Sequence, residues 1–79
     1  MTHEEIMAKI QVIFRDVFDD ETLVIRDSTS SADIEDWDSL EHITLVVSME
    51  KEFNLKFDLK EVNELANVGE MADLIASKL

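Results

Sequence analysis

The 79-residue chain contains no cysteine, no proline and a single glycine. Without cysteine it has no disulfide framework, no cysteine-based zinc site and no thiol of its own for chemistry. One glycine and no proline leave little material for tight hairpins or for a glycine-rich phosphate-binding loop. These absences exclude several classes of site and favour helices that are joined by polar loops.

Basic residues are also scarce, because 7 lysines and arginines stand against 19 aspartates and glutamates, which gives a net charge of −12. Such a charge repels nucleic acid phosphates and anionic membrane surfaces, and it favours protein partners with basic surfaces. No apolar run is long enough for a signal peptide or a transmembrane helix. We expect one domain over residues 1–79, monomeric and cytoplasmic, with no nucleic acid partner and no membrane insertion.

Residues 2–18 have the pattern of an amphipathic helix. Thr2 and Glu5 stand at the spacing of a reciprocal helix cap. The apolar stripe that follows at helical spacing comprises Ile6, Ile10, Ile13, Phe14 and Val17. A connection of about 18 residues comes next, and connections of this length in compact domains are often functional. In it, Leu23, Val24 and Ile25 are expected to attach the loop to the core.

The same cap spacing recurs at Asp38 with Glu41, at Asp58 with Glu61 and at Asn67 with Glu70. It predicts a helix from Asp38 to about Phe53, a short helix through Leu65, and a last helix from about Val68 to Leu79. The core residues expected in the last two helices are Val62, Leu65, Val68, Met71, Leu74, Ile75 and Leu79. The predicted fold is therefore all-α, a small four-helix bundle of three longer helices and a short third helix, with a long first loop.

The second predicted helix carries two apolar stripes. One suits a core and comprises Leu45, Val46, Met49 and Phe53. The other is rotated around the helix axis and comprises Leu40, Ile43 and Val47. Residues 33–52 also carry seven acids against Lys51 alone. Because these acids argue against a helix that is buried on all sides, we expect the second stripe to be a small exposed patch for a partner or ligand.

Ser39 follows the cap residue Asp38 in the first turn of this helix, where free amide groups and the positive end of the helix dipole face outward. A phosphodiester is well placed there, although the dipole contributes only about 0.3–1 kcal/mol and does not specify a phosphate. Taken alone, a serine at this position is simply a good first-turn residue.

The residues suggest two other chemistries, and neither has a complete motif. A serine nucleophile with His42 as its base lacks any evident loop for an oxyanion hole, so His42 is expected to border the core or patch, and His3 to be a solvent-exposed first-turn residue. An EF-hand loop that starts at Asp27 has Ala32 where glycine is needed and Asp38 where a bidentate glutamate is expected. We expect no specific metal site, and loose association of divalent cations with the excess charge stays open.

The tripeptide Asp38-Ser39-Leu40, at the head of a helix after a long acidic loop, resembles the phosphopantetheine attachment motif of acyl carrier proteins. The stretch from Ile34 to Leu40, the helix end at residues 49–53 and the spacing of the last two helices extend the resemblance over essentially the whole chain. It implies an acyl-carrier-protein-like fold. It also implies that a pantetheinyl transferase attaches 4′-phosphopantetheine covalently to Ser39, beside Asp38 and Leu40, and that this arm brings the missing thiol.

The resemblance further implies a carrier that catalyses nothing itself. Acyl groups would travel as thioesters among acyl-loading, condensing and acyl-transfer enzymes with basic docking surfaces, in fatty acid, polyketide or related lipid biosynthesis. The resemblance and the residues of the second helix, with its acids and its second apolar stripe, both imply a partner surface. The residues assigned to that surface are Glu35, Asp36, Trp37, Glu41, Ile43 and Val47.

Some residues depart from housekeeping fatty acid carriers. Asp36 and Trp37 stand where glycine and a small residue are common, and Thr44 and Lys51 stand where acids are usual. We therefore favour a specialised carrier for a secondary lipid, polyketide or related pathway. Trp37 is either a loop anchor or a partner contact beside the arm, and an acyl chain could fold into the bundle or stay outside. The alternative function is that of an acidic helical adaptor without a prosthetic group.

Overall fold

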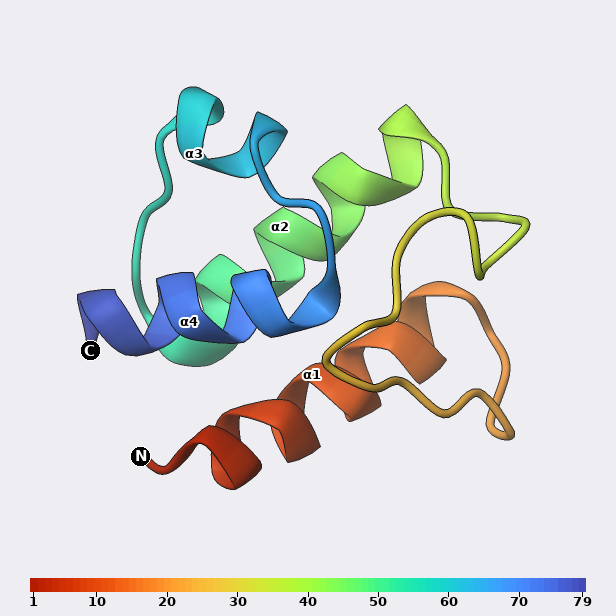
Figure 1. The fold of residues 1–79 in the computed structure, drawn as a ribbon, viewed down its shortest axis with the longest axis horizontal. Coiled ribbons are helices and arrows are strands. Elements are labelled where there is room, and N and C mark those ends of the chain that lie inside the picture. The colour runs from red at the N-terminus through yellow and green to blue at the C-terminus, as the bar shows by residue number, and fades with distance from the viewer.

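The computed structural model describes all 79 residues and contains the helices α1 (His3–Val17), α2 (Ser39–Phe53), α3 (Leu59–Asn63) and α4 (Val68–Lys78). Both α2 and α4 pack against α1, while the short α3 lies apart from α1, on the other side of α4 in the view of Figure 1. The prediction of an all-helical fold with a short third helix and a long first loop is confirmed. No helix has the length and apolar character needed to cross a membrane.

Local capping sets the helix starts within a residue of the predicted positions. At α1 the cap is reciprocal, because the Glu5 amide donates to Thr2 Oγ1 at 3.1 Å and the Thr2 amide donates to Glu5 Oε1 at 2.9 Å. At α4 the Glu70 amide donates to Asn67 Oδ1 at 2.9 Å. Helix α2 ends at Phe53, because the next residue, Asn54, has a left-handed backbone (φ 54°) that stops the helix.

The core contains the residues that the helical periodicity selects in each helix. Those that are buried as predicted are Ile6, Ile10, Ile13, Phe14, Leu45, Val46, Met49, Phe53, Val62, Val68, Met71 and Ile75. Val17, Leu65 and Leu74 are only half-buried. The core prediction for Leu79 is wrong: α4 ends at Lys78, so the terminal residue lies beyond the last helical turn and is exposed.

The first loop is attached to α1 by side chains that the sequence did not single out. The Leu23 carbonyl accepts hydrogen bonds from Gln11 Nε2 at 2.7 Å and from Arg15 Nε at 2.8 Å, and the Ile25 amide donates to Gln11 Oε1 at 2.9 Å. Ile25 is buried and Leu23 is half-buried, as expected. Val24 is exposed, so its predicted role in the core is wrong, because side chains alternate in direction along an extended segment.

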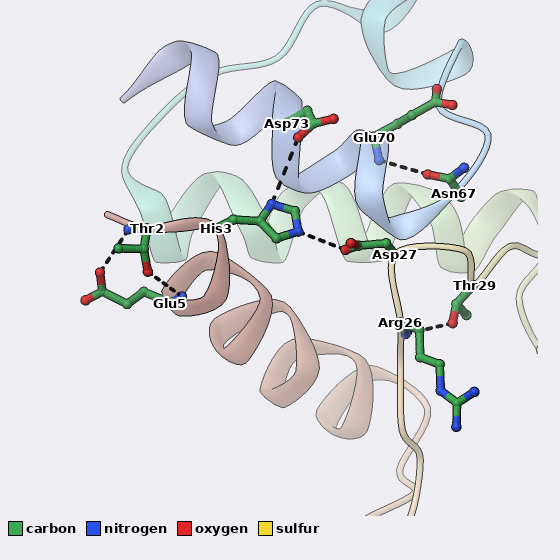
Figure 2. Close-up of polar contacts among 9 residues, drawn as sticks. All are labelled: Thr2, His3, Glu5, Arg26, Asp27, Thr29, Asn67, Glu70 and Asp73. Atoms are coloured by element: carbon green, nitrogen blue, oxygen red, sulfur yellow. Dashed lines mark hydrogen bonds and ion pairs between the residues drawn. The ribbon is translucent and has the colours of Figure 1, made fainter.

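A second set of contacts joins the loop to the start of α4 (Figure 2). The Gly69 amide donates to the Asp27 carbonyl at 2.9 Å, and the Val68 amide donates to the Thr29 carbonyl at the same distance. A Cβ atom on Gly69 would lie only 3.0 Å from the Asp27 carbonyl oxygen and 3.1 Å from its Cβ. The only glycine of the chain is therefore required where the loop backbone meets α4.

His3 extends this junction to α1. It is exposed in the first turn, as predicted, but its Nε2 lies 2.8 Å from Asp27 Oδ1 and its Nδ1 lies 4.0 Å from Asp73 Oδ1 of α4 (Figure 2). The hydrogen bond to Asp27, supported by the negative charges of Asp27, Asp73 and Glu4, raises the pKa of His3 above its ordinary value. A protonated His3 thus links three segments that are distant in sequence.

Candidate functional site

Ser39 is the first residue of α2 and is exposed. The preceding Asp38 has an extended backbone (φ −108°, ψ −172°), and its Oδ1 accepts a hydrogen bond from the Glu41 amide at 2.8 Å. Its carbonyl accepts the His42 amide at 2.9 Å, which starts the helical ladder. The sharp change from loop to helix therefore presents the Ser39 hydroxyl at the end of α2 where the amide groups point outward.

An open cleft of about 430 Å³ lies beside Ser39, between the start of α2 and the region of α3. Polar residues at its wall include Ser31, Asp38 and Asn63. Its apolar lining comprises Trp37, Ile43, Leu59, Val62, Leu65 and Ala66. A group attached to the Ser39 hydroxyl would therefore have mixed polar and apolar surface within immediate reach.

Trp37 and His42 connect the loop, α2 and α3 at this cleft. The Trp37 indole N–H donates to His42 Nδ1 at 3.2 Å, and the two rings stack with centroids 5.9 Å apart. His42 Nε2 lies 3.1 Å from the Val62 carbonyl oxygen. Because Nδ1 accepts the indole hydrogen, we assign the imidazole proton to Nε2, which donates to Val62.

This arrangement does not favour a serine hydrolase. Both ring nitrogens of His42 are engaged, one by Trp37 and the other by Val62, so neither is directed to take a proton from Ser39. His42 is half-buried at the edge of the core, as its sequence position predicted. The histidine therefore has a structural role in this state of the protein.

The two stripes of α2 differ in exposure as predicted. Leu40, Ile43 and Val47 are 69%, 55% and 42% exposed, respectively. The residues of the other stripe are all buried, and Leu45 is fully buried. The exposed stripe begins directly after Ser39 and continues along α2, so the candidate attachment point and an apolar surface share one helix.

Comparison with known proteins agrees with this geometry. Residues 8–75 match the family described as "Phosphopantetheine attachment site", and the matched range includes Ser39. The chain belongs to this family. It is also similar to the solution NMR structure of a holo acyl carrier protein from Geobacter metallireducens, with 46% sequence identity and a TM-score of 0.85, over 91% of this chain and 83% of that one. The chain is therefore a phosphopantetheine-bearing acyl carrier protein by family and by fold.

The acidic residues of the predicted partner surface lie around Ser39. Glu35 and Asp36 are exposed in the turn before α2, Asp38 caps the helix, and Glu41 is half-buried in its first turn. The ion pairs of the structure involve other acids, namely Asp27, Asp73, Glu52 and Glu61. The charges near Ser39 are therefore available to attract a basic surface.

Trp37 is only 8% exposed and belongs to the core. Its ring packs edge-on against Phe14 of α1, with centroids 5.2 Å apart and an interplanar angle of 84°. This burial agrees with the interpretation of Trp37 as a loop anchor. A contact between Trp37 and a partner stays a prediction, and little of its surface is accessible for one.

The residues present fit a covalently attached 4′-phosphopantetheine, the group of this family. The exposed Ser39 hydroxyl would supply the ester oxygen, the start of the 15-residue helix α2 would favour the phosphate, and the cleft offers apolar surface to the arm. The chain has no cysteine, so the thiol comes from the arm when it is bound.

Proposed function

We propose that Ser39 is the residue that carries the arm, and that the chain transports acyl groups as thioesters on it. The observation that carries this proposal is the exposed Ser39 hydroxyl at the first residue of α2, beside an open cleft and inside the range matched by the family. Asp38 holds the turn that presents the hydroxyl, and Leu40 begins the exposed apolar stripe.

The modification is a phosphoryl-group transfer in which the chain is the substrate. The Ser39 oxygen forms a bond to the phosphorus that carries the pantetheine arm of coenzyme A. The bond from that phosphorus to the bridging oxygen breaks, adenosine bisphosphate leaves with the electron pair, and the serine proton goes to a base of the transferase. The carrier supplies only the positioned hydroxyl, in keeping with a non-catalytic role.

The proposed partners are a pantetheinyl transferase and the acyl-loading, condensing and acyl-transfer enzymes that present basic docking surfaces. The acids Glu35, Asp36 and Glu41 would attract such surfaces over a distance, and Ile43 and Val47 would contact them. The departures from housekeeping carriers at Asp36, Trp37, Thr44 and Lys51 support a specialised lipid or polyketide pathway. The cytoplasmic location, the monomeric state and a single carrier domain over residues 1–79 stay predictions.

Intact-mass measurement after incubation with coenzyme A and a pantetheinyl transferase tests the proposal. The wild-type chain should gain one phosphopantetheinyl increment, and Ser39→Ala should gain none while it keeps the helical circular dichroism spectrum of the wild type. Ser28→Ala, which removes an exposed serine of the first loop, is the matched control and should be modified normally.

A wild-type chain that several transferases leave unmodified, but that still binds a basic partner, would instead be the acidic helical adaptor. Modification of Ser39→Ala would show that another residue carries the arm. Either result contradicts the proposal.

A further inference from the structure

The cleft beside Ser39 offers apolar surface at its outer wall. Leu59 of α3 is 73% exposed, and Ile43 of α2, on the same cleft, is also largely exposed. Val62 lines the cleft too, but its side chain is already buried. An apolar group in this cleft can therefore remove Ile43 and Leu59 from water without any change in the core.

A chain of two hydrogen bonds joins three residues that line the cleft, Trp37, His42 and Val62. The Trp37 indole donates to His42 Nδ1, and His42 Nε2 donates to the carbonyl oxygen of Val62, which lies 20 residues away in α3. The imidazole ring thus spans from α2 to α3 and stacks on the indole at an interplanar angle of 22°. We call the ring pair and its two hydrogen bonds the Trp37–His42 bridge.

The Trp37–His42 bridge is attached firmly to the core. Trp37 is buried, and its ring packs edge-on against Phe14, which is fully buried in α1. A change in the position of the indole would therefore disturb the packing of α1. His42 is the member of the bridge that faces both the cleft and α3.

An acyl chain has no hydrogen-bonding group along its length that could replace this bridge. To pass between α2 and α3 it would have to separate His42 from the Val62 carbonyl, or move Trp37 away from Phe14. The first change breaks a part-buried hydrogen bond that joins α2 to α3, and the second opens the core. A chain that stays on Ile43 and Leu59 breaks neither contact.

We propose that His42, held by Trp37, is a positioning residue that keeps an acyl chain of this carrier on Ile43 and Leu59, and out of the space between α2 and α3. The inference rests on the proposed function, because the chain reaches this cleft only on an arm attached to Ser39. It implies that partner enzymes find the cargo exposed on the carrier and need not extract it from the bundle.

The test compares a short and a long cargo on the same carrier. A pantetheinyl transferase loads acetyl-coenzyme A or dodecanoyl-coenzyme A onto the isotope-labelled protein, and the intact mass confirms the product. The reporters are the indole N–H signal of Trp37, which is the only tryptophan, and the methyl signals of the buried Leu45 and Met49. In the wild type, the signals of Leu45 and Met49 should be the same for both cargoes, because the chain stays outside the core.

Three variants separate positioning from general stability. His42→Ala opens the bridge, so dodecanoyl should now shift the Leu45 and Met49 signals, and the rise in melting temperature from the acetyl to the dodecanoyl form should exceed that of the wild type. His42→Gln should restore wild-type behaviour, because its amide can accept from Trp37 and donate to Val62. Thr44→Ala removes an exposed side chain that bonds only within α2, and should behave like the wild type.

The outcomes distinguish this inference from the proposed function. If the mass shows no loaded arm, the proposed function fails and the inference falls with it. If the arm loads and dodecanoyl shifts the Trp37, Leu45 and Met49 signals of the wild type, the cargo enters the bundle and only the inference is overturned. This second comparison needs no variant, so it decides the question even if His42→Ala does not fold.

Discussion

A charge placed on the buried stripe of α2 should unfold the domain, whereas the same charge on the exposed stripe should lower its stability only slightly. This contrast tests the assignment of the partner surface. We consider Leu45→Asp and Val47→Asp. The two positions lie two residues apart on one helix, but Leu45 is fully buried whereas Val47 is exposed. The same substitution is therefore made in two environments with almost the same local sequence.

The magnitude follows from burial. Loss of a fully buried leucine side chain removes about 1.5–3 kcal/mol of hydrophobic stabilisation, and an ionised carboxylate without a partner costs several kcal/mol more. At roughly 0.05–0.15 kcal/mol per residue, a chain of 79 residues has a free energy of unfolding of about 4–12 kcal/mol. Leu45→Asp should therefore remove most or all of the stability of the domain.

Val47→Asp should cost much less. An aspartate in a helix interior is less favourable than a good helix former by at most about 0.7 kcal/mol, and exposed substitutions otherwise change stability by about 0.5 kcal/mol or less. The partly buried area of the valine adds a small further loss. We expect a folded domain that is about 1 kcal/mol less stable, because the new carboxylate stays in water.

The assays are urea unfolding followed by circular dichroism, and then the rate of modification by a pantetheinyl transferase. Val47→Asp should weaken binding of the partner, with little change as salt is added, because a direct apolar contact is lost. Thr44→Asp is the matched control, since it adds the same charge at an exposed position of the same helix without removing an apolar side chain. If Val47→Asp unfolds the chain as completely as Leu45→Asp, the reasoning is refuted and the partner surface lies elsewhere.

Two further predictions concern charge. Glu41→Lys should slow modification by the transferase most at low salt and much less once charges are screened, because Glu41 is expected to act by long-range attraction. A loss of modification rate that does not depend on salt would contradict this role. The second prediction concerns His3, at the junction of α1, the loop and α4. Its pKa is raised in the folded state, so its contribution to stability is complete below the ordinary pKa of 6.5. That contribution is lost as the pH rises through the raised pKa. The melting temperature should therefore fall on substitution of Asp27 by Asn more at about pH 6 than at about pH 8, although the effect is small because the pair is exposed. An equal fall at both values would show that the contact does not depend on the charge of His3.

The helices themselves could be predicted because their signals are local. The cap at Thr2 with Glu5 and the helical spacing of Ile6, Ile10 and Ile13 lie within a few residues of one another. Physical contacts at this range depend little on the rest of the chain. The same reasoning separated Leu45 from Val47 correctly, since a helix has one buried side.

The contacts of the loop could not be predicted in this way. An extended segment has no helical period, so three consecutive apolar residues looked alike and Val24 was misplaced, although only its neighbours face α1. The bond from Gln11 to Leu23 and Ile25 likewise depends on how the loop returns along α1. Every residue of this chain has the same backbone amide and carbonyl groups, so the sequence does not indicate which side chain will bind them.

The amino-acid sequence by itself determined the four helices, most of their buried apolar residues, and the position of Ser39 at a helix start, because capping and periodicity act between near neighbours. Only the tertiary structure decided that Trp37 is an anchor on Phe14, that His42 bridges to Val62, and that Gly69 meets the backbone of Asp27. These contacts depend on the distances between packed elements. They arise only when hydrophobic burial has brought separate segments together, and no spacing along the chain encodes them.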